Sequence, residues 1–169
     1  MAIIRCTQKL LSELKAKPSE SIQEPSELSS WHANLLRIDR RKCVLFTHDT
    51  TLYSFFVPRL KKPDFGNIRE VFRQKFFKAL IAEDIPQKHI EIFLKANREI
   101  RISKTNNRSV LGSMTDLSFQ LKYKIAYEGG IENADIPKLI HDINRIPMSA
   151  IEEIYSIYAL KKLFEQLNR

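Results

Sequence analysis

The sequence predicts an α+β protein in which a small antiparallel β-meander sheet of about four strands packs against about five helices. Three consecutive segments between residues 32 and 58 are rich in β-branched, aromatic and leucine residues, and short polar turns separate them. Most of the remaining chain carries apolar residues at three- and four-residue steps, the period of amphipathic helices. With 169 residues, the chain is most simply one domain, residues 1–169.

The first 30 residues predict a strand, a short helix and a loop. Residues 3–6 are apolar enough for a short strand, and "QKLLSELK" favours one or two helical turns. Residues 15–30, "KAKPSESIQEPSELSS", contain two prolines and five serines. This composition is typical of a surface loop, which we expect to be mobile.

The strongest strand signal lies in "HANLLRID", "KCVLFTH" and "TLYSFFVP", which we interpret as an antiparallel meander. Alternate residues of a strand share a face. The middle strand should therefore turn Val44, Phe46 and His48 to one side, and Cys43, Leu45 and Thr47 to the other. Since both sets are largely apolar, each face of the sheet should be at least partly covered.

Apolar spacing predicts helices over residues 68–80 and 88–95, the first with Asn67 as its N-cap. The alternation in "REIRISK" indicates a fourth strand, which we expect to return to the meander. A long helix over residues 110–125 should end at the two glycines that follow it.

The C-terminal part predicts two more helices. Apolar residues within residues 136–143 indicate a short helix. Ser149 and Glu152 have the spacing of a capping box, so we expect them to start the last helix.

The formal net charge is +8, and the cations are concentrated in the middle of the chain. This balance suits a polyanionic partner such as RNA or DNA. A cationic hairpin tip could contact a phosphate backbone, with Trp31 and Tyr53 stacking on bases. The alternative is that charged tips only protect a sheet from edge-to-edge association. The candidate backbone-contact patch consists of Arg37, Arg40, Arg41 and Lys42.

The segment "SKTNNRSVLGSMTDL" lies between the predicted fourth strand and the long helix. Free N–H groups and the helix dipole favour an anion at such an entrance. The alternative is purely structural: Thr105, Asn106 or Asn107 caps the helix, and Arg108 pairs with an acid such as Asp116 or Glu99. Gly112, one turn inside, weakens the helix, so a ligand or another element should approach closely there. The candidate anion-binding residues are Lys104, Thr105, Asn106, Asn107, Arg108 and Ser109.

Several classes of protein find no support in the sequence. There is no apolar run long enough to span a bilayer and no signal peptide, so we expect a cytoplasmic protein without membrane contact. Cys6 and Cys43 are expected to be buried, unreactive thiols. No motif for metal, cofactor or nucleophilic catalysis is present, so we predict no metal site and no cofactor, and catalytic residues stay unassigned.

Four segments carry a resemblance to a known family: "IIRCTQKLL", the meander, "KTNNRSVLGSMTDL" and "NRIPMSA". Together they resemble a family of uncharacterised bacterial proteins with a domain of unknown function. Its members share a similar Ile-Arg-Cys-Thr-x-Lys-Leu-Leu start and a Lys-Thr-x-x-Arg-Ser-Val-Leu-Gly-x-Met-Asn-Asp-like segment. Thr115 stands where the family has Asn. The resemblance implies a bacterial, single-module protein and no particular activity.

Our leading hypothesis is a module that binds an anionic partner, most plausibly RNA or DNA, through the hairpin tip and the helix entrance. One alternative is a protein-interaction or regulatory module, for example the partner of a toxin. A second is an enzyme acting on a phosphorylated or carboxylated small molecule. The simplest chemistry would be metal-independent work on a phosphodiester, with Lys104 and Arg108 holding the phosphate and His32 or His48 as general base. The sequence does not predict the oligomeric state.

Overall fold

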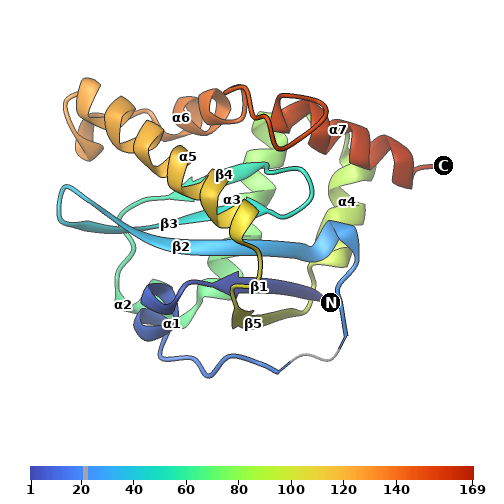
Figure 1. The fold of residues 1–169 in the computed structure, drawn as a ribbon, viewed down its shortest axis with the longest axis horizontal. Helices are drawn as coiled ribbons and strands as arrows, with labels where there is room; N and C mark the ends of the chain where they lie inside the picture. Colours follow the sequence, from blue (N-terminus) through green and yellow to red (C-terminus); the bar gives the residue numbers. More distant parts are fainter. Residues whose placement is uncertain (21–22) are drawn as a thin grey trace.

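A computed structural model describes residues 1–20 and 23–169. Within these residues five strands form one sheet, which seven α-helices surround (Figure 1). The α+β class is therefore confirmed, although the sequence predicted about four strands and about five helices. The strands are β1 (Ala2–Cys6), β2 (Ser30–Ile38), β3 (Arg41–His48), β4 (Ser54–Val57) and β5 (Ile100–Lys104).

The helices follow the predicted order, with one additional short element. The sequence pattern missed α2 because it is only five residues long; the Asp64 carboxylate accepts a hydrogen bond from the Lys61 N–H at its start (2.8 Å). The α-helices are α1 (Gln8–Leu14), α2 (Lys62–Gly66), α3 (Ile68–Ala82), α4 (Gln87–Ala96), α5 (Arg108–Tyr127), α6 (Ile136–Ile143) and α7 (Ser156–Leu167). The 3₁₀ turns η1 (Glu27–Ser29) and η2 (Ile131–Asn133) precede β2 and follow α5.

The sheet is mixed, with strand order β4-β3-β2-β1-β5, so the prediction of a purely antiparallel sheet was wrong. The meander itself is confirmed, because β2, β3 and β4 pair antiparallel. However, β1 runs parallel to both β2 and β5. The fourth predicted strand, β5, thus pairs with β1 rather than with the meander. The reason is that β1 already occupies the open edge of β2.

The sheet lies between helices on both faces (Figure 1). In that view α5 crosses in front of the strands, while α3 lies behind them. The predicted alternation along β3 is confirmed: Val44 and Phe46 join the cluster that includes α3 and α4, and Cys43 and Leu45 join the one that includes α5 and α6. The first cluster is rich in aromatic rings, with Trp31 edge-on to several phenylalanines.

Both edges of the sheet are covered by polar contacts. The Ser19 N–H donates to the Ile102 carbonyl on the β5 edge (2.7 Å). At the other edge, the Asn144 side chain pairs with both backbone groups of Ser54, at 2.8 and 2.7 Å. These contacts satisfy groups that an open edge would offer to another chain. The predicted loop 15–30 includes Ser21 and Ile22, which lie outside the described residues.

The last helix begins at Ser156, so the prediction that Ser149 starts it was wrong. Ile154 has φ of 68°, a left-handed conformation that an α-helix does not accept. The Met148 N–H donates to the Ile154 carbonyl (2.8 Å) and closes this segment into a loop. In the described part of the chain, no helix has the combination of length and apolar character needed to cross a membrane.

Candidate functional site

A row of polar side chains crosses the sheet on the face that α5 covers. Strand register places Ser54 opposite Thr47, Thr47 opposite His32, and His32 opposite Arg5, which in turn lies opposite Ser103. All except Ser103 are buried. Buried polar groups need hydrogen-bond partners. The segments that supply these partners must therefore pack against this row.

Asp49, in the turn after β3, is the centre of that network. Its carboxylate accepts hydrogen bonds from the Ser30 hydroxyl (2.5 Å) and from His32 Nδ1 (2.6 Å), and it pairs with Arg5 (3.3 Å). Burial raises the pKa of Asp49, but the hydrogen bonds from His32 and Ser30 outweigh this effect and hold the pKa below its usual 3.8. Asp49 is therefore a carboxylate that the fold keeps charged.

The same network fixes the entrance of α5. His32 Nε2 accepts from the Asn106 N–H (3.4 Å), which fits the tautomer with its proton on Nδ1. Asn107 Oδ1 accepts from the Val110 N–H (3.1 Å), so Asn107 is the N-cap of α5. Capping is thus confirmed for Asn107 alone, and anion binding by the entrance side chains stays a proposal.

The other predicted entrance residues face outward. Lys104 and Arg108 are exposed and have no ion-pair partner among the described residues. Ser109 is also exposed, while Thr105 is partly buried. Two free cations therefore lie where the helix dipole is positive, which favours negative charge nearby.

The predicted hairpin patch is divided between free and paired cations. Arg37 and Arg40 are exposed, and neither has an ion-pair partner within residues 1–20 and 23–169. Arg41 pairs with an acid on η2, and Lys42 pairs with an acid on α1. Since paired cations have less charge to offer a phosphate, the patch reduces mainly to Arg37 and Arg40.

The hairpin tip and the α5 entrance do not converge. Asp39 Oδ2 accepts from the Ile131 N–H (2.7 Å), which holds the tip beside the segment that follows α5 (Figure 1). The entrance lies at the opposite end of this 20-residue helix. At 1.5 Å per residue, the two basic clusters are separated by roughly 30 Å of helix. Any ligand that contacts both must extend along α5.

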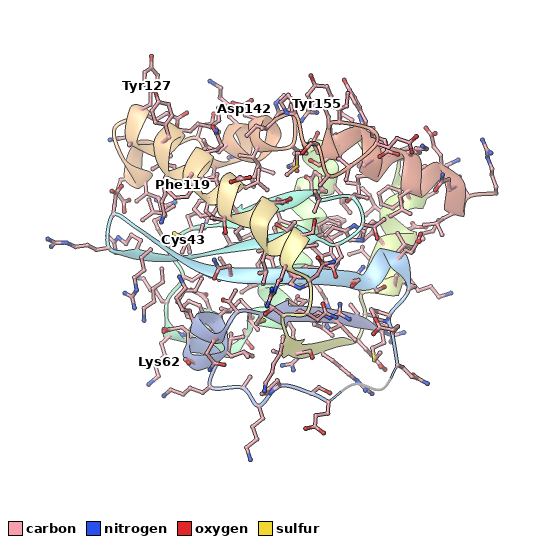
Figure 2. The ribbon with its side chains drawn as sticks, in the orientation of Figure 1. Cys43, Lys62, Phe119, Tyr127, Asp142 and Tyr155 are labelled. Atoms are coloured by element: carbon pink, nitrogen blue, oxygen red, sulfur yellow. The ribbon has the colours of Figure 1, made fainter. Side chains whose placement is uncertain are left out.

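Three exposed aromatic side chains lie between these clusters. Phe119, Tyr123 and Tyr127 are 69%, 73% and 86% exposed and recur at steps of four along α5. Figure 2 shows Phe119 on the helix and Tyr127 pointing away from the molecule. At 100° per residue they share one side of the helix with six other residues, among them the exposed acid Asp116. We call this set the α5 outer face: Arg108, Gly112, Thr115, Asp116, Phe119, Lys122, Tyr123, Ala126 and Tyr127.

The aromatic residues that the sequence predicted for base stacking lie elsewhere in the fold. Trp31 and Tyr53, expected to stack on bases, are completely buried in the aromatic cluster. The signal for the exposed aromatics was present as a four-residue spacing opposite the buried stripe of Val110, Met114 and Leu117. An apolar stripe normally marks the core-facing side of a helix, so the second, exposed stripe on α5 is a candidate contact surface.

Gly112 provides a first testable prediction. A Cβ built at Gly112 meets no atom within 4 Å, so no element of the described chain requires glycine there. We expect Gly112→Ala to raise the free energy of unfolding by about 1 kcal/mol through helix propensity, measured by urea denaturation. Gly130→Ala should have the opposite effect, because Gly130 has φ of +105° and its Cβ would lie 3.0 Å from Asp39 Oδ2. If Gly112→Ala instead lowered the free energy of unfolding, the added methyl group would have to clash with a neighbouring atom, which contradicts the open space around Gly112.

The remaining reactive side chains are buried and dispersed. Cys6 and Cys43 are buried as predicted; burial raises the pKa of Cys6 to about 12 and also raises that of Cys43. His32 and His48, considered as general bases, are both fully buried on opposite faces of the sheet. Among the described residues, no three metal-ligating side chains gather in one place.

Comparisons with known proteins identify the family. Neither the curated proteins nor the solved structures contain a significant match to this chain. One family model, described as a domain of unknown function, matches residues 3–159. This match covers the meander, the buried polar row and all of α5. The chain therefore belongs to the DUF6933 family.

Proposed function

We propose that the protein binds single-stranded nucleic acid along the α5 outer face. The observation that carries this proposal is the row of Phe119, Tyr123 and Tyr127, exposed between two groups of unpaired cations. Leaving three aromatic rings in water forgoes the stabilisation that burial would give, and contiguous exposed apolar patches usually mark binding sites. Aromatic rings beside cations are the combination that single-strand binding uses.

The charges are placed to follow an extended backbone. Lys104 and Arg108 lie at the beginning of α5, Lys122 lies beside the aromatics, and Arg37 and Arg40 lie on the hairpin near its end. Phosphates repeat along a strand, so cations spaced along one line can each neutralise one of them. Single strands rather than duplexes are the expected ligands, because bases must be unpaired to stack on side chains.

The aromatic contribution can be measured directly. We expect the Tyr123→Ser/Tyr127→Ser double variant to bind a fluorescein-labelled oligonucleotide of about 12 nucleotides at least about tenfold more weakly, since stacking contributes roughly 1–3 kcal/mol per base. Fluorescence anisotropy at low salt gives both affinities. Tyr158→Ser, which removes a tyrosine 56% exposed on α7, is the matched control and should bind like the wild type. Equal binding by all three proteins contradicts the proposal.

The cationic contribution has a separate signature. Arg108→Ala should lower the salt dependence of binding by about 0.7 in the slope of log K against log salt, the expected value for one phosphate contact on a single strand. The tyrosine variant should leave this slope unchanged because it removes no charge. An unchanged slope for Arg108→Ala would place the phosphate contacts away from the α5 entrance.

A protein partner for the same surface is the second candidate. The observation that favours it is the bare backbone at Gly112, because small residues let another helix approach closely. In that case the wild-type protein should form a stoichiometric complex with its partner, and Gly112→Leu should abolish that complex. Neither the wild type nor the variant should bind the oligonucleotide.

A further inference from the structure

A second site is suggested by a hollow of about 580 Å³ that lies between α3, α6 and the end of β4. This volume is within the range of small-molecule sites, roughly 300–1,000 Å³. Its walls include seven apolar residues, namely Phe56, Pro58, Ala79, Ala82, Ile136, Pro137 and Ile140. None of these seven residues belongs to the α5 outer face; of the residues that line the hollow, Lys138 also borders Tyr123 and Tyr127.

The rim of the hollow is positively charged. Lys75 and Lys78 come from α3, and Lys138 comes from α6; all three are exposed and lack an ion-pair partner among the described residues. Arg59 and His141 also line it, but each pairs with a carboxylate, on Glu132 and Asp142 respectively.

The acid among the lining residues does not neutralise this rim. Glu83 is 3% exposed at its side chain and accepts two hydrogen bonds from the Arg145 guanidinium, at 3.2 and 2.7 Å. Its charge is therefore balanced inside the protein. Lys75 and Lys78 are one turn apart on α3, a like-charge arrangement that slightly destabilises a helix. An anion between the two helices would relieve that repulsion.

We propose that this hollow binds a small amphipathic anion, with its apolar body against the walls and its carboxylate or phosphate at Lys75 and Lys78. The apolar walls favour a hydrocarbon or aromatic body, since few polar groups are available inside to replace lost water contacts. The lysines supply point charges that accept either headgroup. Carboxylates and phosphate esters share this chemistry, and the test below separates them.

The test uses octanoate, octyl phosphate and octanol as probes. Backbone amide shifts in two-dimensional NMR follow each titration of the full chain below the probe's aggregation concentration. We expect octanoate or octyl phosphate to shift α3 and α6 resonances and to bind at least tenfold more tightly than octanol. The tighter of the two anions identifies the headgroup. Equal binding of all three probes, or no binding at millimolar concentration, overturns the proposal.

Two variants distinguish the contribution of the lysine charges to binding from that of the apolar walls. Lys75→Met/Lys78→Met should weaken binding of the anion at least tenfold and leave octanol unchanged, whereas Ala82→Trp should block both. Lys88→Met/Lys95→Met, on α4, is the matched control and should bind like the wild type. Unchanged anion binding in the first variant contradicts the site. Because none of these residues lies on the α5 outer face, oligonucleotide affinity gives an independent readout.

Discussion

Asp49→Ala is expected to lower the free energy of unfolding by about 3 kcal/mol. The reason is that Arg5, whose side chain is only 7% exposed, loses its buried counter-charge. Removing one partner of a buried ion pair typically costs about 3–5 kcal/mol. We expect the lower value for two reasons. The side chain of Asp49 is 15% exposed, and in the variant Arg5 still pairs with the carboxylate of Glu24. Urea denaturation at pH 7 measures the change.

The second carboxylate supplies a matched control. Glu24 pairs with the same guanidinium at 3.2 Å, nearly the 3.3 Å of Asp49, but its side chain is 86% exposed. Exposed ion pairs contribute about 0–1 kcal/mol, so Glu24→Ala should have a small effect. Similar losses for the two variants would contradict the argument that the buried contacts of Asp49 with Arg5, Ser30 and His32, rather than the distance of a carboxylate from Arg5, determine the strength of this network.

Stability should fall by about 3 kcal/mol between pH 7 and pH 4 because of His48 alone. Burial lowers the pKa of His48 from 6.5 to about 4, against weaker opposing effects from Asp49 and from the backbone of Glu27 and Leu28. In this pH range the unfolded chain binds a proton that the folded chain does not. Folding stability therefore rises with pH across this window, by about 1.4 kcal/mol for each unit of pKa difference.

His48→Asn tests this prediction, because asparagine does not titrate and its oxygen can replace Nδ1 as acceptor for the Thr51 N–H. Unfolding free energies at pH 7, 5.5 and 4.5 should depend less on pH in the variant, whatever its absolute stability. The lowered pKa of Asp49 adds its own loss only below about pH 4. An unchanged pH dependence in His48→Asn would contradict the assignment.

The local parts of the fold could be predicted from the sequence, but the long-range pairings could not. The meander has short turns and clear alternation, so β2, β3 and β4 follow from neighbouring residues. The parallel pairing of β1 with β2 and β5 joins segments separated by long connections, on which local patterns give no information. The start of α7 was misplaced because the Ser149–Glu152 spacing fits a capping box, whereas Ile154 adopts a left-handed conformation.

The candidate site shows the same division. Asn107 was identified among the expected caps because capping depends on residues three apart. The contact of His32 with Asp49 depends on strand register and was not predictable from spacing. The exposed aromatics of α5 were missed because composition does not distinguish a buried ring from an exposed one. Exposed and buried residues of α5 are distinguished only by their angle around the helix axis, which places Phe119 opposite the buried stripe of Val110, Met114 and Leu117.

Photo-cross-linking tests the central claim most directly. A short RNA carrying 4-thiouridine would be irradiated with the wild-type protein, and the cross-linked peptides would be identified by mass spectrometry. The proposal predicts cross-links within α5, at Phe119, Tyr123 or Tyr127, and their loss at high salt. Cross-links confined to other segments, or none at low salt, would contradict nucleic-acid binding by the α5 outer face.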